Sequence, residues 1–215
     1  GMELTGCSRK KSSLVNLVLI ILLSMPCVLG YNLWAWDGFA VFGGAVLDVE
    51  DLERFIMEHA DGAKAAGGKL RLPGLLELLL ERTDVERVRL SSIEPPDVTP
   101  ELCSVMAGAG ERIAPFLHVC LQSGCDETLR RMARVYRTDL FRRACETARE
   151  AVAGMALGTD LIVGFPGETD DEFERSLAFC REMGFARMHV FRYSRRPGTP
   201  AATMPDQVGA RESAE

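Results

Sequence analysis

The sequence lacks the cysteine pairs that typically bind zinc or form redox-active disulfides. No two of its seven cysteines have CxxC spacing. They are scattered singly, at Cys7, Cys27, Cys103, Cys120, Cys125, Cys145 and Cys180. Several fall on the apolar faces of expected helices or strands, which favours reduced, buried thiols in a cytoplasmic protein.

The chain also lacks an excess of positive charge and a recognisable nucleophile–base pair. Its 25 Lys and Arg residues are outnumbered by 31 Asp and Glu residues, giving a formal net charge of −6. Such a chain has no global attraction for nucleic acid, so any binding of that kind must be local. There are three histidines. Two of them, His118 and His189, lie in apolar strand patterns that favour a hydrogen-bonded core histidine over a catalyst.

Residues 1–70 do not share the pattern of the rest of the chain. An uncharged run at 12–36 follows three basic residues at 9–11 and precedes Asp37. A bilayer core needs about 20 apolar residues, so the run is just long enough to be a signal anchor. Asn16, Pro26 and Asn32 weigh against insertion. The alternative is an insertion-like segment that does not enter a membrane.

From residue 71 the sequence alternates between strand and helix signals. We expect strands at 85–93, 115–121, 157–163 and 187–193, and helices at 72–81, 99–109, from 126, from 138 and at 169–184. This alternation predicts an α/β fold with the four strands side by side. Four βα units cannot close an eight-stranded barrel, so we expect part of a TIM-like barrel. The predicted domains are an atypical segment at 1–70, the partial barrel at 71–208 and a linker at 209–215.

Individual helices carry clearer signals. Thr169 and Glu172 have the spacing of a capping box, and Gly184 suits the end of that helix. Its expected buried face is Phe173, Leu177 and Cys180. Asp126 is the expected N-cap of an earlier helix. The helix from 138 should bury Phe141, Ala144, Cys145, Ala148 and Val152, which recur in phase.

Polar residues gather where the predicted strands end, which is where α/β proteins bind ligands. They are Ser91, Ser92, Glu94, Gln122, Ser123, Asp160, Glu168, Tyr193, Ser194, Arg195 and Arg196, with Arg134 one helix downstream of Gln122. Arginine can bind a carboxylate, while Asp and Gln can bind hydroxyls or an amine. The set therefore indicates a zwitterionic ligand that carries hydroxyl groups.

Five motifs in order resemble those of the radical S-adenosylmethionine (SAM) methylthiotransferases. They are LSSIEP at 90–95, LQSGCD at 121–126, RMAR at 131–134, TDLIVGFPGET at 159–169 and RPGTPA at 196–201. The wording of the first motif and His189-Val190-Phe191 are most similar to the MtaB type, which modifies N6-threonylcarbamoyladenosine next to the anticodon of tRNA. The MiaB and RimO types are close relatives.

The resemblance implies radical chemistry with two cofactors, SAM and a [4Fe-4S] cluster. The cluster would reduce SAM to a 5′-deoxyadenosyl radical that abstracts hydrogen from the adenine ring. A sulfur carried by a second cluster and methylated by another SAM would then be inserted at C2. The cofactor-binding residues carried over by resemblance are Gln122, Ser123, Arg134, Asp160, Gly164, Val190 and Phe191. Of these, Arg134 would bind the SAM carboxylate, Gln122 and Asp160 its ribose or amino group, and the backbone of Val190 and Phe191 would face the adenine.

The chain departs from this family in its cysteines. The CxxxCxxC loop that binds the radical cluster is absent, so the resemblance implies no metal ligands and no assignable catalytic residue in this chain. It further implies that the cluster loop precedes Gly1 and that an RNA-binding TRAM domain follows Glu215. Other departures are Ala133 for asparagine and Arg195 for proline. We therefore expect a fragment that is inactive alone.

Two alternatives remain open. One is another radical SAM enzyme, either a MiaB- or RimO-type methylthiotransferase or a coproporphyrinogen dehydrogenase-like enzyme. The other is an inactive remnant tethered to the membrane through residues 12–36. We favour a divergent insertion, or translation of non-coding sequence, over an anchor, because both ends of a span inside a barrel would have to return to one sheet.

The partner implied by the resemblance is tRNA, with no DNA partner and a cytoplasmic location. A local basic patch could contact its phosphates despite the acidic total. The candidates are Arg130, Arg131, Arg134, Arg137, Arg142 and Arg143, with Arg192, Arg195 and Arg196 near another strand end. A solvated helix face explains the first six equally well. The oligomeric state is not indicated.

Overall fold

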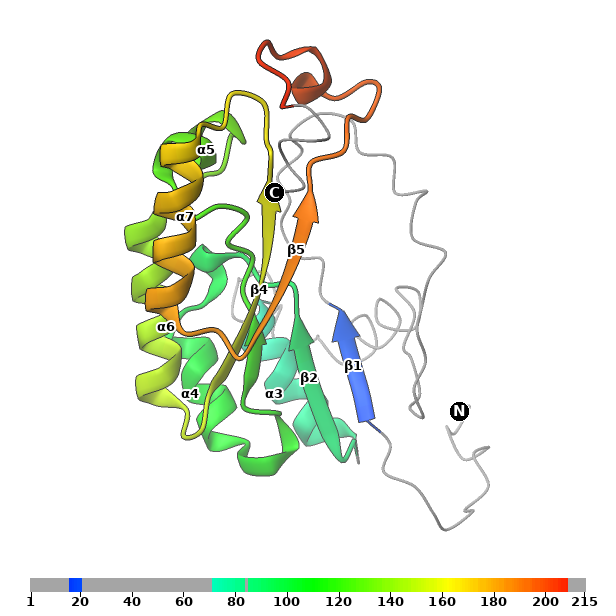
Figure 1. The fold of residues 1–215 in the computed structure, drawn as a ribbon. Coiled ribbons are helices and arrows are strands. Elements are labelled where there is room, and N and C mark those ends of the chain that lie inside the picture. The colour runs from blue at the N-terminus through cyan, green and yellow to red at the C-terminus, as the bar shows by residue number, and fades with distance from the viewer. Residues whose placement is uncertain (1–15, 21–70, 84, 209–215) are drawn as a thin grey trace.

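The computed structural model describes residues 16–20, 71–83 and 85–208. Within these residues the chain alternates between parallel strands and helices (Figure 1). The predicted domain boundary at residue 70 and the predicted linker at 209–215 fall on or beside residues outside the described part. They stay predictions.

The strands are β1 (Asn16–Ile20), β2 (Arg87–Ser91), β3 (Phe116–His118), β4 (Ala156–Val163) and β5 (Arg187–Arg192). β1 pairs with β2, and β3, β4 and β5 form a three-stranded sheet, all in parallel. Isolated parallel bridges at Val88–Ile113 and Ile93–Val119 join the two sheets. The four strands predicted from sequence are therefore confirmed, and they lie side by side.

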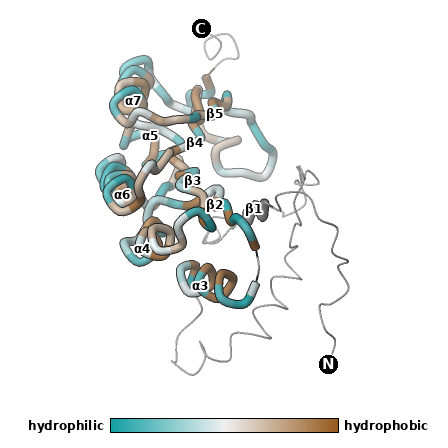
Figure 2. Tube along the Cα trace, turned by 90° about the horizontal axis from the view of Figure 1, so that it is seen from below, coloured by the Kyte–Doolittle hydropathy of each residue, from teal (hydrophilic) through white to brown (hydrophobic). Residues whose placement is uncertain are grey.

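The helices are α3 (Leu72–Arg82), α4 (Pro100–Gly108), α5 (Asp126–Arg131), α6 (Thr138–Ala151) and α7 (Asp170–Met183), with short 3-10 turns at Pro95–Asp97, Gly110–Arg112 and Pro200–Thr203. They lie along one side of the curved row of strands (Figure 2). Because consecutive parallel strands need a crossover, each helix returns the chain to the start of the next strand. The arrangement is a partial TIM-like α/β fold.

The core lies between the strands and the helices and is built from the residues that the sequence patterns place inward. α3 buries Leu75, Leu76 and Leu79. α6 buries Phe141, Ala144, Cys145 and Ala148, as expected. Val152 just beyond α6 is buried too. The core therefore follows the helical period of these two helices.

The capping prediction for α7 is confirmed, and α4 is capped in a similar way. Thr169 accepts a hydrogen bond from the Glu172 backbone while the Glu172 side chain accepts one from the Thr169 backbone, which is the reciprocal capping box. Gly184 ends the helix with a left-handed φ of 59°. Thr99 caps α4 through the Leu102 backbone N–H, with Pro100 at the first helical position.

Two local predictions need correction. Of the face expected for α7, Cys180 is buried and Leu177 is partly buried, whereas Phe173 is 38% exposed. The other buried residues of α7 are Glu172, Ser176, Phe179 and Met183. Glu172 and Ser176 are polar, and both are hydrogen-bonded where they are buried. A hydrophobicity pattern does not predict the burial of such residues.

Asp126 is the other correction. The N-cap of α5 is Cys125, and Asp126 is the first residue of the helix. The Asp126 carboxylate instead accepts a hydrogen bond from the Thr138 backbone at the start of α6, at 2.9 Å. It thereby ties the two helices together.

The apolar run at 12–36 contributes a strand rather than a spanning helix where the structure describes it. Asn16–Ile20 is β1, in register with Arg87–Ser91 of β2. Among the described residues there is no helix of the length and apolar character needed to cross a membrane. The remainder of the run lies outside the described residues.

Candidate functional site

The turns that follow two strands hold non-glycine residues in left-handed backbone conformation. Ser92, after β2, has φ of 56°, and Gln122, after β3, has φ of 67°. Gln122 is fixed from both sides, because its N–H donates to the Asp160 carbonyl at 2.9 Å and its carbonyl accepts from Ile162 at 2.8 Å. Such strain costs on the order of 1–2 kcal/mol per residue and is concentrated at functional sites.

An ion pair lies beside these turns. Arg134 donates to Glu94 at 3.1 Å, and the two side chains are only 19% and 16% exposed. Burial raises the pKa of Glu94, and Arg134 opposes that rise. The segment after α5 that carries Arg134 is anchored by Tyr136, whose hydroxyl donates to the Cys120 carbonyl at 2.7 Å.

Cys120 shows that the charged residues of this edge share one environment. Burial raises the pKa of the Cys120 thiol to about 12, and the charges of Glu94 and Asp160 add to the rise while Arg134 opposes it. Gln122 and Asp160 are joined directly, by the hydrogen bond between their backbones. Arg134 acts on the same thiol as Asp160 through its charge.

Asp160 lies within β4 rather than at its end, and two histidines contact it. His118 Nε2 is 3.0 Å and His189 Nδ1 is 3.2 Å from Asp160 Oδ1. Burial alone would raise the pKa of Asp160, but the hydrogen bonds and charges of the two histidines outweigh it and hold that pKa below its usual value. His118 is a buried, hydrogen-bonded histidine, as the strand pattern predicts. His189 is 41% exposed, so the core interpretation was wrong for it.

The predicted Gly164 lies in the turn between β4 and α7 and is the position where a left-handed φ, 72°, requires glycine. Its N–H donates to the Glu168 carboxylate at 2.5 Å. Burial raises the pKa of Glu168, and the backbone N–H groups of this turn oppose the rise. The turn is thus closed by its own glutamate.

Three predicted site residues remain, Ser123, Val190 and Phe191. Ser123 is fully buried and its hydroxyl accepts from the Cys125 N–H at 3.2 Å, which is a structural role. Val190 and Phe191, on β5, are 53% and 52% exposed. The Phe191 ring contacts His189, with centroids 6.3 Å apart, so it shares the face of Asp160.

The predicted basic patch is largely neutralised. Arg131, Arg134, Arg142 and Arg143 pair with Glu172, Glu94, Glu182 and Asp139 respectively. Arg137 donates to two backbone carbonyls. These partners favour a structural role for most of the helix arginines.

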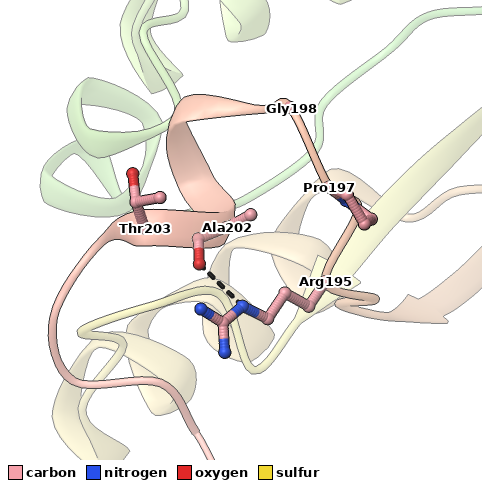
Figure 3. A pocket seen from close by; sticks show the side chains of 5 residues that line it. All are labelled: Arg195, Pro197, Gly198, Ala202 and Thr203. Atoms are coloured by element: carbon pink, nitrogen blue, oxygen red, sulfur yellow. Dashed lines mark hydrogen bonds between the residues drawn. The ribbon is translucent and has the colours of Figure 1, made fainter.

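Beyond β5 the chain folds into a loop that encloses a pocket of about 360 Å³ (Figure 3). It is lined by Arg195, Pro197, Gly198, Ala202 and Thr203. Arg195 Nε donates to the Ala202 carbonyl at 2.7 Å and closes the loop on itself. Arg195 stands where the resembled family has proline. Here the loop is held by the Arg195 side chain, through its hydrogen bond to Ala202, rather than by a proline ring.

Sequence reasoning missed three residues of this site. Glu94 was seen only as a polar residue at a strand end, and His118 and His189 only as core residues. Each of these pairings joins residues that are 29 to 42 positions apart in the sequence, so no local sequence pattern predicts it. The one available signal was that Asp160 is a charged residue inside an apolar strand.

The described cysteines do not fit an iron–sulfur cluster. All five, Cys103, Cys120, Cys125, Cys145 and Cys180, are buried and free. Burial raises the pKa of Cys120 and Cys145 to about 12, so these thiols stay protonated. Over the described ranges the one group of three close potential metal ligands is His118, Asp160 and His189, which contains no thiol.

S-adenosylmethionine does fit the residues present. Its α-ammonium and α-carboxylate groups match the charges of the partly buried Glu94–Arg134 pair. A ligand with both charges can exchange partners with the pair without leaving either charge unmatched. The charged groups of S-adenosylmethionine are therefore complementary to this pair of side chains.

Comparison with known proteins shows the family of this chain. The Radical SAM superfamily matches residues 38–180. A tRNA-2-methylthio-N(6)-dimethylallyladenosine synthase from Thermobifida fusca (strain YX) is 44% identical over 142 residues, which are 66% of this chain and 28% of that protein. The threonylcarbamoyladenosine tRNA methylthiotransferase MtaB from Bacillus subtilis (strain 168) is 42% identical over 134 residues, 62% of this chain and 30% of that protein.

A solved structure supports the fold alone. Coproporphyrinogen III oxidase (HemN) from Escherichia coli, a radical SAM enzyme, superposes with a TM-score of 0.55 at 17% identity, covering 80% of this chain and 45% of that one. The chain spans less than a third of the length of the two methylthiotransferases above. The superfamily match extends over more than half of the sequence, and its relatives are tRNA methylthiotransferases of the MiaB and MtaB types. This chain therefore belongs to the radical SAM superfamily.

Proposed function

We propose that the chain is the S-adenosylmethionine-binding part of a tRNA methylthiotransferase, with N6-threonylcarbamoyladenosine as the favoured nucleoside. Relatives that act on tRNA, at 42–44% identity, support the enzyme class. The MtaB-type substrate rests on the Ser-Ser-Ile-Glu-Pro motif and on His189-Val190-Phe191. A dimethylallyladenosine substrate is the alternative, since relatives of that kind match equally well. A cytoplasmic location goes with a tRNA substrate.

The observation that carries the proposal is the Arg134–Glu94 pair beside the strained Gln122. The two side chains are only 19% and 16% exposed, and an ion pair removed from water to this degree is weak evidence for stability in itself. Here the pair lies at the end of parallel strands, where α/β folds bind ligands. We assign Arg134 to the carboxylate of the ligand and Glu94 to its ammonium group.

The other predicted residues take supporting roles. The Gln122 side chain and the β5 backbone at Val190 and Phe191 are assigned to the nucleoside half, and Gly164 keeps the neighbouring turn compact. Asp160 is left out of this set, because its Oδ1 already contacts two imidazoles. When bound, S-adenosylmethionine supplies the methyl group that gives this enzyme class its name. The described residues offer no cluster ligands, and no reaction step is assigned to them.

The test is the affinity of the full chain for S-adenosylmethionine, measured by isothermal titration calorimetry. Hydrogen bonds to charged groups contribute about 1.5–3 kcal/mol, so Arg134→Gln should weaken binding by roughly 10- to 150-fold. The matched control is Arg143→Gln, which removes an exposed arginine paired with Asp139 on α6. Wild-type affinity in the Arg134 variant would overturn the assignment.

Removing Arg134 alone also leaves the partly buried Glu94 without its partner. The double variant Glu94→Gln, Arg134→Gln removes both charges together, so it should regain stability lost in the single variant. The double variant should not regain affinity for S-adenosylmethionine. If binding returned in the double variant, the loss in the single variant would reflect misfolding rather than a missing contact.

A further inference from the structure

We propose that His118, Asp160 and His189 form a binding site for a divalent transition-metal ion. The site lies on the β3–β4–β5 sheet and is separate from any iron–sulfur cluster. The three side chains come from three neighbouring strands, and their ligand atoms all lie within 4.8 Å of one another.

Two of the three ligand separations already suit a bound ion. The nitrogens of His118 and His189 are 3.0 Å and 3.2 Å from Asp160 Oδ1. An ion with bonds of about 2.0–2.2 Å to nitrogen and oxygen has neighbouring ligands roughly 3.0–3.4 Å apart. The third separation, between the two imidazole nitrogens, is at most 4.8 Å, so binding requires the rings to move closer together. His189, whose side chain is 41% exposed, is the ring that would move.

The sheet prepares the buried half of this site. Asp160 and His189 are direct partners in the β4–β5 register, and His118 is opposite Gly158 in the β3–β4 register. A Cβ on Gly158 would lie 3.0 Å from His118 Nδ1 and 2.8 Å from the Phe116 ring. The absence of a side chain there leaves the space that the His118 imidazole occupies. Its side chain is 8% exposed, so its position is fixed by packing.

The ligand types select the class of ion. Two imidazole nitrogens and one carboxylate oxygen favour Zn²⁺, Co²⁺, Ni²⁺ or Fe²⁺, whereas Mg²⁺ and Ca²⁺ prefer oxygen-only sites. Three protein ligands leave at least one coordination position for water or a substrate atom. The exposed fraction of the side chain increases from 8% at His118 to 24% at Asp160 and 41% at His189. The open coordination position is therefore reached from the β5 side.

The site does not rest on the proposed function. It uses neither Arg134 nor Glu94, and its ligands are imidazoles and a carboxylate rather than thiolates. Loss of S-adenosylmethionine binding would leave the metal site standing, and loss of metal binding would leave the nucleoside site standing.

The test is titration of the full chain with Co²⁺, followed by visible absorption spectroscopy. We expect one saturable site with ligand-field bands and no thiolate-to-cobalt charge-transfer band, because no thiol is a ligand. His189→Ala and Asp160→Asn should each weaken Co²⁺ binding at least tenfold. Asp139→Asn, which changes an exposed carboxylate on α6, is the matched control and should bind like the wild type.

His189→Ala decides the proposal even if substitutions at the buried His118 unfold the chain, because His189 is partly exposed and its removal leaves the core intact. The absence of saturable binding, a strong thiolate charge-transfer band, or wild-type affinity in His189→Ala would each overturn the proposal. Weakened binding in His189→Ala with unchanged circular dichroism would support it.

Discussion

Glu172 connects three parts of the structure through one carboxylate. Arg131 donates to both of its oxygens, at 2.9 Å and 2.5 Å, and the Thr169 N–H donates to Oε2 at 3.0 Å. The side chain is 9% exposed. The hydrogen bonds from Arg131 lower the pKa of Glu172, with a further contribution from the Thr169 backbone, while burial opposes them. The carboxylate therefore favours folding only while it is ionised.

The variant Glu172→Gln should lower the free energy of unfolding by roughly 1–3 kcal/mol at neutral pH, because it removes a charged acceptor from a bidentate contact. Since the pKa is lower in the folded chain than the usual 4.5, this stabilisation is present above 4.5 and lost as the pH falls through the folded value. The difference between variant and wild type should shrink in acid. Urea denaturation at neutral pH and below pH 4.5 checks this.

Glu174→Gln, at an exposed position of the same helix, is the control for the pH series. Its stability should follow the wild type throughout. If the difference between wild type and Glu172→Gln stayed constant down to acid pH, the ionised carboxylate would not be the stabilising species.

Some residue-level features were accessible from sequence and others were not. The capping box at Thr169 and Glu172 is local, four positions long, and was predicted correctly. The salt bridge from Glu172 to Arg131 spans 41 positions and was not. It explains why a charged residue occupies the buried face of α7, which the hydrophobic pattern assigned to Phe173.

At the scale of elements, the turn after β3 packs directly on α7. A Cβ on Gly124 would lie 2.7 Å from the Ser176 carbonyl oxygen and 2.9 Å from the Phe179 Cβ. The Gly124 N–H also donates to the Ser176 hydroxyl at 2.8 Å. The absence of a side chain at this position thus sets the distance between the Gln122 turn and the helix behind it.

Gly124→Ala should therefore destabilise the chain by roughly 1–3 kcal/mol, the usual cost of overpacking, since backbone atoms must move. Thermal unfolding followed by circular dichroism measures the effect. Gly108→Ala is the matched control, because a Cβ there meets nothing within 4 Å at the end of α4. That control should be neutral or stabilising by up to about 1 kcal/mol. Equal stability of the two variants would contradict the close packing of the turn on α7.

The order and type of the elements were predictable because βα repeats leave a strong periodic signal. The four predicted strands and the helices α3, α4, α6 and α7 are found near their expected positions. The segment at 16–20 was not predictable as a strand, because an uncharged run of that length reads equally as a spanning helix. Only its parallel partner, β2, decides its form.

At the scale of the whole molecule, the chain has the charge balance of a protein that does not attract RNA globally. The helix arginines are mostly paired with acids, so a tRNA contact should come from the end of β5 instead. Arg192 and Arg196 lie there on exposed backbone, close to the nucleoside side of the site.

The double variant Arg192→Gln, Arg196→Gln should weaken binding of a tRNA anticodon stem–loop and reduce its dependence on salt by up to about two phosphate contacts. Filter binding of the full chain at several salt concentrations measures both quantities. Arg142→Gln, which removes an arginine paired with Glu182, is the control. An unchanged salt slope in the double variant would place the RNA contact elsewhere.

The candidate site was predicted in its chemistry but not in its pairings. A carboxylate, an amide and a guanidinium near the strand ends are visible in the sequence, and their role as a cofactor site stays a prediction. That Arg134 would pair with Glu94, and Asp160 with two histidines, depends on how neighbouring strands align. Strand order and register are properties of the folded sheet.

The central claim is that Arg134 and Glu94 bind the amino-acid end of S-adenosylmethionine. The most direct measurement compares S-adenosylhomocysteine, which has that end, with 5′-methylthioadenosine, which lacks it, on wild type and Arg134→Gln. We expect the wild type to prefer S-adenosylhomocysteine by at least tenfold and the variant to lose this preference while still binding 5′-methylthioadenosine. A preference that survives in Arg134→Gln would contradict the central claim.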